Sequence, residues 1–209
     1  VDFSRLDGTS REQGLALRAQ YGLKEEDFVL VYAAEFSQRK SQAVLIRAMA
    51  ELPERVHLIL PGEGALLEEC RMLAAELGVE ERVLFPGYCT HMAPWYTAAD
   101  AAAAASRIEG LPFHVMEAMY LGLPVIASAV KGHVDLIEEG QNGLLYPYGD
   151  SKAFARQVRR LLEEPGLRDG MAARTRASVL QYGLEQVLPQ VWDCYTALFQ
   201  ESREKYPVR

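Results

Sequence analysis

Short apolar runs of strand length alternate with longer segments of helix length between residues 28 and 146. This strand–helix–strand order predicts a parallel sheet, because parallel neighbours need a long crossover, which is usually a helix. The runs are apolar at nearly every position, as expected for strands that helices cover on both faces. The sequence therefore predicts an α/β fold with a doubly wound, Rossmann-like parallel sheet of about six strands.

The predicted elements follow from the lengths and periods of these segments. We expect strands at 28–34, 56–60, 82–85, 100–105, 124–127 and 143–146, and helices between them at 42–52, 65–77, 91–98, 112–121 and 133–139. The five alanines at 101–105 favour a helix by propensity, but the segment is short and follows a helical stretch, so we interpret it as a strand. After Asp150, which we expect to be an N-cap, only helices are predicted, at 151–163, 166–182 and 184–203.

Length and composition limit the class of protein. The chain has 209 residues, which at about 150 residues per domain indicates one large domain, or one domain with extensions. Its net charge of -7 gives no general attraction to nucleic acid or to an anionic membrane, so any phosphate binding must be local. The chain starts with Val1 and not with Met, and we therefore expect it to begin inside a longer protein.

The three cysteines, Cys70, Cys89 and Cys194, are isolated and match neither a disulfide framework nor a metal-binding spacing. No apolar run reaches the roughly 18 residues of a spanning helix, and the N-terminus does not resemble a signal peptide. These features together predict a cytoplasmic protein.

The loop and helix after the fourth predicted strand contain two glutamates eight residues apart, Glu109 and Glu117. Ligands of open parallel sheets bind beyond the carboxyl ends of the strands, which is where this segment starts. Pro112 suits the first helical position, so that the N–H groups of Phe113 and His114 are free to meet an anion such as a diphosphate.

The spacing of the two glutamates suits a nucleotide sugar. Glu117 lies about one turn, or roughly 5 to 6 Å, further along the helix, where its carboxylate can accept hydrogen bonds from ribose hydroxyls. Glu109 can hold hydroxyls of a sugar on the far side of the diphosphate. Carboxylates suit such ligands because they accept from two vicinal hydroxyls at once.

At these residues the chain resembles the retaining glycosyltransferases of the GT-B fold, often called glycosyltransferase group 1. Glu109 and Glu117 match the paired glutamates of that family, and the segment 117–127 (EAMYLGLPVIA) matches what usually follows. The resemblance runs from about residue 28 to 162 and includes these further motifs: PGEG at 61–64, VLFPG at 83–87, Ala99-Asp100, GQNGL at 140–144, and Asp150. One pair of glutamates would be weak evidence, but the whole ordered set is specific.

The resemblance implies two Rossmann-like domains that face each other, of which this chain would be the C-terminal, donor-binding one. Residues 1–27 would then be a segment and helix that enter from an N-terminal domain absent here, 28–165 the nucleotide-sugar-binding domain, and 166–209 C-terminal helices packed on it. In the family the first glutamate contacts the donor sugar and the second the ribose, roles that pass to Glu109 and Glu117. The reaction retains anomeric configuration, with the leaving phosphate assisting the incoming hydroxyl.

The loop after the first strand carries the basic residues that the family uses to hold the diphosphate and neutralise the leaving group. Arg39 and Lys40 fit this role. The family commonly has Gly-Arg where this chain has Ala34-Glu35, so Arg39 either substitutes for that arginine or faces solvent. Lys40, Arg39 and Glu109 form the predicted catalytic set.

The predicted nucleotide-binding set consists of Lys40, Arg39, Tyr88, Glu109, Leu111, Phe113, His114 and Glu117. Tyr88 either lines the base pocket or is a packing tyrosine, and His114 either touches a phosphate or caps and packs. Gly62 and Gly64 form a tight turn in our interpretation and not a dinucleotide fingerprint, since Leu67 stands where the third glycine should be.

No Asp-x-Asp pair is present, and His57, His91, His114 and His133 form no ligand cluster in the sequence, so we expect no metal and no other cofactor. The expected partners are a nucleotide-diphosphate sugar, the N-terminal acceptor domain, and a glycan or lipid-linked acceptor, with membrane-surface association through the absent half and a location at its inner face. The predicted function is sugar transfer in glycan or polysaccharide synthesis. A nucleotide-sugar epimerase of the same fold and a non-catalytic nucleotide-sugar-binding module are the alternatives.

Overall fold

A computed structural model describes residues 1–205, with the backbone alone for Pro165 and residues 202–205. Its centre is one sheet of six parallel strands in the order β3-β2-β1-β4-β5-β6. The strands are β1 (Phe28–Val31), β2 (Val56–Ile59), β3 (Val83–Leu84), β4 (Ala101–Ala104), β5 (Val125–Ser128) and β6 (Gly143–Tyr146). The predicted α/β fold with a doubly wound parallel sheet is confirmed.

Strands β1 and β4 lie side by side at the centre of the sheet, with Leu30 opposite Ala101 and Val31 opposite Ala102. The strand order changes direction between them, and ligands of such sheets bind at this switch point, beyond the carboxyl ends. The alanines of β4 are buried on both faces. A strand of alanines forms here because tertiary packing between helices outweighs their helix propensity.

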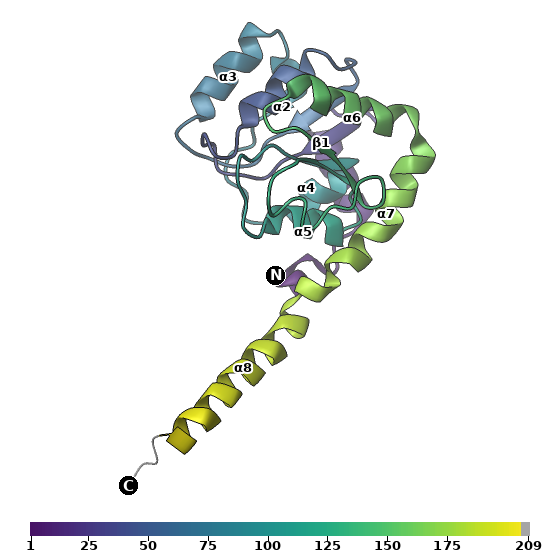
Figure 1. The fold of residues 1–209 in the computed structure, drawn as a ribbon. Helices are drawn as coiled ribbons and strands as arrows, with labels where there is room; N and C mark the ends of the chain where they lie inside the picture. Colours follow the sequence, from purple (N-terminus) through teal and green to yellow (C-terminus); the bar gives the residue numbers. More distant parts are fainter. Residues whose placement is uncertain (206–209) are drawn as a thin grey trace.

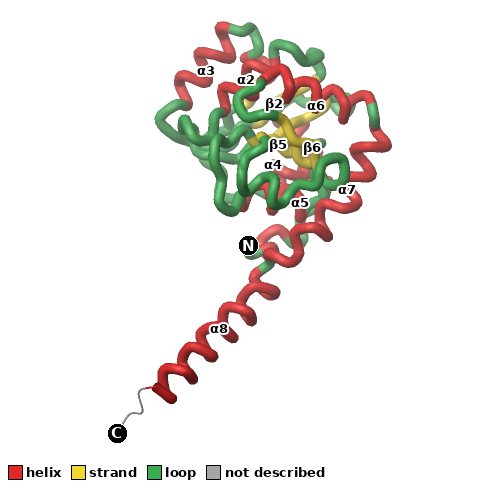
Figure 2. Tube along the Cα trace, in the orientation of Figure 1, coloured by secondary structure: helices red, strands yellow, loops and turns green. Residues whose placement is uncertain are grey.

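Helices cover both faces of the sheet (Figures 1 and 2). One face carries α2 (Gln42–Met49), α3 (Leu67–Glu76) and α6 (Ser151–Glu163), and the other carries α1 (Arg11–Gln20), α4 (Ala93–Ala98), α5 (Phe113–Tyr120) and α7 (Pro165–Val179). Short 3-10 helices lie at Phe3–Leu6, Glu80–Arg82 and Leu180–Tyr182. Helices α1 and α4 touch through their backbones, because a Cβ on Gly14 would lie 2.3 Å from the carbonyl oxygen of Thr97.

The last helix, α8 (Leu184–Lys205), extends away from the body of the molecule (Figure 1). Its large apolar side chains are exposed: Leu184, Leu188, Val191, Trp192, Tyr195, Leu198 and Phe199. Helix α7 lies against α5, whereas α8 makes its main contacts with the short 3-10 helix that precedes it. Residues 206–209 lie outside the described chain.

Two local predictions are wrong. The segment predicted as a helix at 133–139 forms consecutive turns, since Gly132 has a φ of +89° and Asn142 takes the place of helical partners. Oδ1 of Asn142 accepts from the N–H of Glu138 at 2.9 Å, and its Nδ2 donates to the carbonyl of Leu136 at 3.1 Å. Pro112 is the N-cap of α5 and not its first residue.

The predicted N-cap of α6 is present. Asp150 is the N-cap of α6, and its Oδ1 accepts from the N–H of Ala153 at 2.8 Å.

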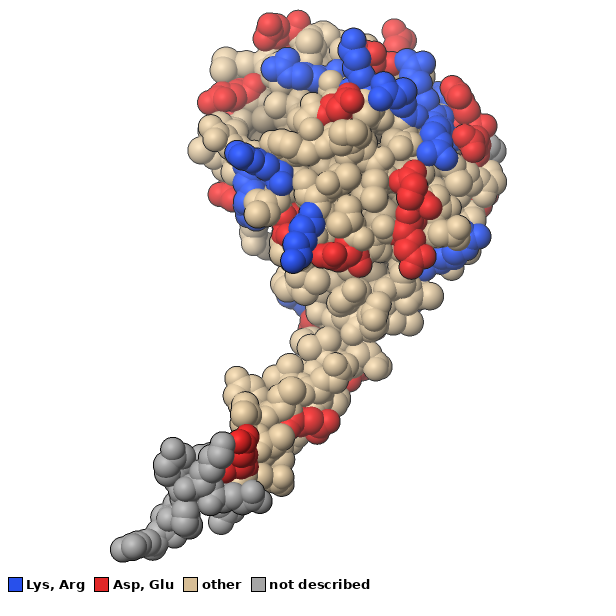
Figure 3. All heavy atoms as spheres, in the orientation of Figure 1, with Lys and Arg blue, Asp and Glu red and all other residues tan. Residues whose placement is uncertain are grey.

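Although the chain is acidic overall, Lys and Arg gather over the part of the body where α6 runs (Figure 3). Exposed basic residues of α6 are Lys152, Arg156 and Arg159. Within residues 1–205 no helix is both long enough and apolar enough to cross a bilayer.

Candidate functional site

A buried ion pair lies at the switch point, between the loops that follow β1 and β4. Nζ of Lys40 lies 2.5 Å from Oε1 of Glu109, and Oγ of Ser106 donates to the same oxygen at 2.6 Å. Only 9% of Lys40 and 8% of Glu109 are exposed. Arg39 approaches the other carboxylate oxygen at 4.0 Å, but half of its side chain faces solvent. Lys40, Arg39 and Glu109, predicted from separate loops, are thus brought together.

The backbone holds these two loops in contact. The N–H of Arg107 donates to the carbonyl of Arg39 at 2.8 Å, which joins the loop after β4 to the loop after β1. Oη of Tyr32, at the end of β1, lies 3.0 Å from the carbonyl oxygen of Lys40 and 2.9 Å from Oγ of Ser106. Ser41 adopts a left-handed conformation with a φ of +53°, which turns the chain from the loop into α2. The positions of Lys40 and Glu109 are therefore set by a hydrogen-bonded framework.

The electrostatic state of the pair follows from these contacts. Burial would raise the pKa of Glu109, but the hydrogen bonds from Lys40 and Ser106 outweigh it and hold that pKa below its usual value. Glu109 is therefore ionised at neutral pH. A buried carboxylate and a buried ammonium together can bind a ligand that presents both an anion and hydroxyl groups.

Two histidines lie close to this pair. Burial, with the positive charge of Lys40, lowers the pKa of His114 to about 3, so its imidazole is neutral. His133 is fully buried and its pKa is also lowered, chiefly by burial. Its Nδ1 lies 2.8 Å from the carbonyl oxygen of Ser128, and since a carbonyl only accepts, Nδ1 carries the proton. Nε2 of each histidine is buried with no hydrogen-bond partner in the described chain.

The start of α5 faces the same end of the sheet. The carbonyl of Pro112 accepts from Val115 at 3.0 Å and from Met116 at 3.2 Å. The N–H groups of Phe113 and His114 lie before these donors in the first turn and therefore have no acceptor within the helix. These two N–H groups are free to donate to an anion. Phe113 is 55% exposed and Leu111 is 50% exposed, so their side chains add apolar surface at the mouth of the site.

Glu117 lies on the part of α5 that contacts α4. Its Oε2 accepts a 3.1 Å hydrogen bond from the hydroxyl of Tyr96. Burial raises the pKa of Glu117, and the bond from Tyr96 opposes that effect only in part. Val115, Ala118 and Met119 of the same helix are buried, while Glu117 keeps partial exposure. The carboxylate therefore retains an accessible edge that can accept further hydrogen bonds.

A separate cavity of about 350 Å³ lies at the carboxyl ends of β1, β2 and β3. Tyr88 and Cys89 line one side of it, and Gly62 with its neighbours lines another. Tyr88 is 72% exposed, so the structure gives it no core-packing role. The cavity is large enough for a flat aromatic ring with an open side, and it borders the loop that carries Arg39 and Lys40.

The glycines beside this cavity form a tight turn, as predicted. A Cβ on Gly62 would lie 2.0 Å from the carbonyl oxygen of Ala34, and one on Gly64 would lie 2.4 Å from that of Phe36. Both residues also have φ values near +150°. Only glycine lets the two loops approach so closely, which explains the motif without a phosphate-binding role.

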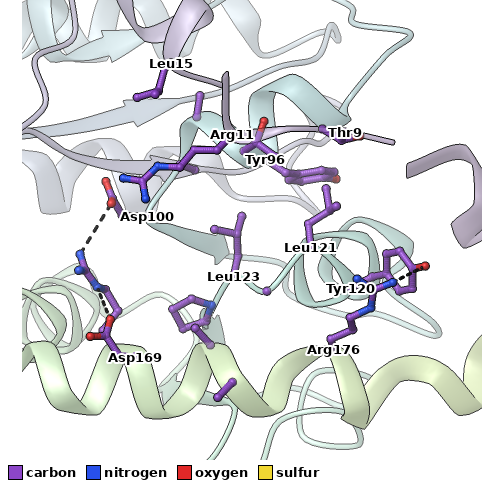
Figure 4. Close-up of a pocket in the computed structure, with 18 of the residues that line it drawn as sticks. Thr9, Arg11, Leu15, Tyr96, Asp100, Tyr120, Leu121, Leu123, Asp169 and Arg176 are labelled. Atoms are coloured by element: carbon purple, nitrogen blue, oxygen red, sulfur yellow. Dashed lines mark hydrogen bonds and ion pairs between the residues drawn. The ribbon is translucent and has the colours of Figure 1, made fainter. Parts of the chain in front are cut away.

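A larger cavity, of about 700 Å³, lies elsewhere, between the α1–α4 pair and the α5–α7 pair (Figure 4). Asp100 and Pro124, which precede β4 and β5, line it, so it opens at the amino ends of the strands. Asp100 is already paired there with Arg18 at 2.8 Å and with Arg168 at 3.7 Å. We place the candidate site at the carboxyl ends, because parallel sheets bind ligands at that edge.

Three contributors to the site were not predicted from the sequence. Ser106 and Tyr32 hold Glu109 and Lys40 in place, and His133 lies beneath them. Ser106 could have been found, because it directly follows the predicted strand at 100–105, whereas Tyr32 lies inside the strand predicted at 28–34 and follows the strand only as the structure has it. His133 could not, since its burial depends on the turns that replaced the predicted helix.

Comparison with known proteins gives consistent matches along the chain. The family model described as "Glycosyl transferases group 1" matches residues 15–178. The chain is 36% identical to the "Putative glycosyltransferase EpsD" of Bacillus subtilis (strain 168), over 98% of this chain and 55% of that protein. It is 32% identical to a D-inositol 3-phosphate glycosyltransferase of Xylanimonas cellulosilytica, over 97% of this chain and 48% of that protein.

Solved structures with the same fold include HepE from Anabaena in complex with UDP and glucose, with a TM-score of 0.88 and 28% identity over 94% of this chain and 55% of that one. Sucrose-phosphate synthase from Thermosynechococcus elongatus matches with a TM-score of 0.86 and 29% identity, over 97% of this chain and 52% of that one. The chain thus spans about half the length of the relatives it matches.

Proposed function

This chain belongs to the group 1 glycosyl transferases, and from that membership we propose that it is the donor-binding domain of a retaining glycosyltransferase. In this proposal it binds a nucleotide-diphosphate sugar whose sugar passes to an acceptor hydroxyl, in glycan or polysaccharide synthesis. The family predicted from the motifs is confirmed, and its named relatives are enzymes that transfer sugars.

One observation carries the proposal. Lys40, Glu109 and the first N–H groups of α5 converge at the switch point between β1 and β4. A diphosphate placed there meets a cation and a helix N-terminus, both of which attract negative charge. A sugar on one side of it meets Glu109, and a ribose on the other side meets Glu117.

Each residue then has a distinct role. Lys40 and Arg39 neutralise the charge that grows on the diphosphate as the glycosidic C–O bond breaks. Glu109 accepts from donor-sugar hydroxyls and Glu117 from ribose hydroxyls. Tyr88 lines the pocket for the base, which is the cavity at the ends of β1 to β3.

The two glutamates act as ligands in this proposal and not as an attacking pair. Glu109 lies in the loop after β4 and is paired with Lys40, whereas Glu117 lies on α5 and accepts from Tyr96. In this proposal the two carboxylates do not flank one glycosidic bond, as they would in a glycosidase. We propose that the leaving phosphate assists the incoming hydroxyl on the same face of the sugar, without a metal ion.

HepE was crystallised with UDP, and this makes UDP the first nucleotide to test here. A thermal-shift panel of UDP, GDP, ADP and their glucose or mannose derivatives tests the proposal. A ligand present at about 100 times its Kd adds about 2.7 kcal/mol of stability. We expect a clear rise in Tm with one base and little with the matching nucleosides, whereas no shift with any nucleoside diphosphate would contradict the proposal.

The acceptor, the N-terminal acceptor domain, the cytoplasmic location and the association with a membrane surface stay predictions. Product analysis of the longer protein, with and without an acceptor, separates sugar transfer from the epimerase alternative. A binding module without catalysis would release no sugar in either case.

A further inference from the structure

Lys40 and Glu109 neutralise each other in the structure. Their 2.5 Å contact is buried, with 11% of the lysine side chain and 6% of the glutamate side chain exposed. The proposed function needs the ammonium to face a diphosphate and the carboxylate to face sugar hydroxyls. Neither group offers its full capacity to a ligand while each is bound to the other.

Separating a buried ion pair without a replacement is strongly unfavourable, because it leaves uncompensated charge in a poorly solvated place. Lys40 can therefore leave Glu109 only when another anion takes over its positive charge. A diphosphate is such an anion. Arg39 needs no such exchange, since half of its side chain already faces solvent and it lies 4.0 Å from the carboxylate.

The carboxylate has a hold of its own that does not depend on Lys40. Oγ of Ser106 donates to Oε1 of Glu109 at 2.6 Å, and Ser106 is fixed in turn by its contact with Tyr32. When Lys40 turns away, Glu109 keeps its position and one acceptor site becomes vacant. A sugar hydroxyl, which donates a single hydrogen bond, fits that vacancy.

We propose that Glu109 competes with the diphosphate for Lys40, so that diphosphate binding releases the Glu109 carboxylate to accept the donor-sugar hydroxyls. This inference rests on the proposed function. It makes sugar recognition conditional on the diphosphate, because a free sugar brings no anion to exchange. Within the described chain, Lys40 is the buried group at the switch point that can exchange Glu109 for a diphosphate. His114 cannot do so, because its low pKa leaves the imidazole uncharged.

Calorimetric titration with inorganic pyrophosphate tests the exchange. In Glu109→Gln the competing charge is gone, and pyrophosphate should bind about tenfold more tightly than to the wild type. Glu26→Gln is the control, because it removes an exposed carboxylate that lies before β1, away from the switch point, and makes no contact with Lys40 in any described hydrogen bond or ion pair. It should change the affinity by less than about threefold, which measures the screened long-range effect of one charge.

A second titration compares UDP with UDP-glucose. The wild type should gain affinity from the glucose, and Glu109→Gln should bind UDP more tightly but lose most of that gain. If Glu109→Gln does not fold, Glu109→Asp, which keeps the charge but shortens the reach to Lys40, should show a smaller tightening in the same direction. Circular dichroism before each titration shows that the variants are folded.

A change of pyrophosphate affinity in the opposite direction would overturn the inference. If Glu109→Gln binds pyrophosphate more weakly than the wild type, or no more tightly than Glu26→Gln does, Glu109 orients Lys40 and does not compete for it. In that case the proposed function still stands, provided that the wild type binds a nucleoside diphosphate through Lys40. A wild type that binds neither pyrophosphate nor any nucleoside diphosphate would remove both.

Discussion

The hydroxyl of Tyr96 donates a 3.1 Å hydrogen bond to Oε2 of Glu117 and so ties α4 to α5. The bond fixes one oxygen of a carboxylate whose pKa burial raises. Because the other oxygen has no hydrogen bond among the described contacts, Glu117 is held in one orientation with an acceptor still to be filled. Such an arrangement suits the recognition of a polar ligand better than it suits stability.

We predict that Glu117→Gln weakens nucleotide binding by roughly 1 to 3 kcal/mol, which is the range for a charge-assisted hydrogen bond. Tyr96 can still donate to the amide oxygen, so the fold should be retained. Calorimetry with a nucleotide and its 2′,3′-dideoxy analogue measures the effect. A mutant that prefers ribose over dideoxyribose as strongly as the wild type would show that Glu117 is not the ribose ligand.

The depressed pKa of His114 predicts a pH dependence of stability. A histidine with a folded pKa of about 3 and an ordinary unfolded value near 6.5 contributes stability that is fully present above pH 6.5 and is lost as the pH falls towards 3. His114→Asn should therefore flatten the loss of stability between pH 6.5 and 4 in urea denaturation. A His114→Asn variant whose stability falls as steeply as that of the wild type between pH 6.5 and 4 would contradict this prediction.

The buried ion pair predicts that a second substitution restores the stability lost by the first. Lys40→Met leaves the Glu109 carboxylate buried without its partner and should cost about 3 kcal/mol of unfolding free energy. Adding Glu109→Gln should restore most of that loss, whereas Arg39→Met at the exposed 4.0 Å contact should cost less than about 1 kcal/mol. Chemical denaturation measures all three, and a double variant as unstable as Lys40→Met alone would mean that the pair is not coupled.

Gly132 lies against Glu109 and predicts a variant that acts on the site through the backbone. A Cβ there would lie 2.9 Å from Cβ of Glu109, at a φ of +89°. Gly149 has a similar φ of +81° but open space around it, so Gly149→Ala shows the backbone strain alone, about 1 to 2 kcal/mol.

We expect Gly132→Ala to destabilise more than Gly149→Ala does and to weaken binding of UDP-glucose more than binding of UDP. Denaturation and calorimetry on the two variants give these differences. Equal effects of both substitutions on the preference for the sugar would rule out a contact of functional importance between Gly132 and Glu109.

The sheet and the two glutamates were predictable because they depend on local patterns. The apolar run of β1 and the spacing of Glu109 and Glu117 are properties of contiguous sequence. The alanine strand β4 was predictable only from its neighbours, since its own propensity favours a helix.

The rest depends on contacts between distant residues. The pairing of Lys40 with Glu109 joins loops 69 positions apart, and no local pattern indicates that the two would bind each other. The helix predicted at 133–139 does not form, and Asn142, further along the chain, binds the backbone of Leu136 and Glu138 within that segment. The exposure of α8 likewise could not be predicted from its own amphipathic sequence, because it depends on whether another part of the fold covers the helix.

The most direct measurement of the central claim is the affinity of the 209-residue chain for UDP and for uridine, in the wild type and in Lys40→Met, by calorimetry on folded protein. If the switch point holds a diphosphate, UDP binds at least about tenfold more tightly than uridine, and Lys40→Met removes most of that difference while uridine binding stays unchanged. Equal affinities for UDP and uridine in the wild type, or equal losses for both ligands in Lys40→Met, would contradict the account.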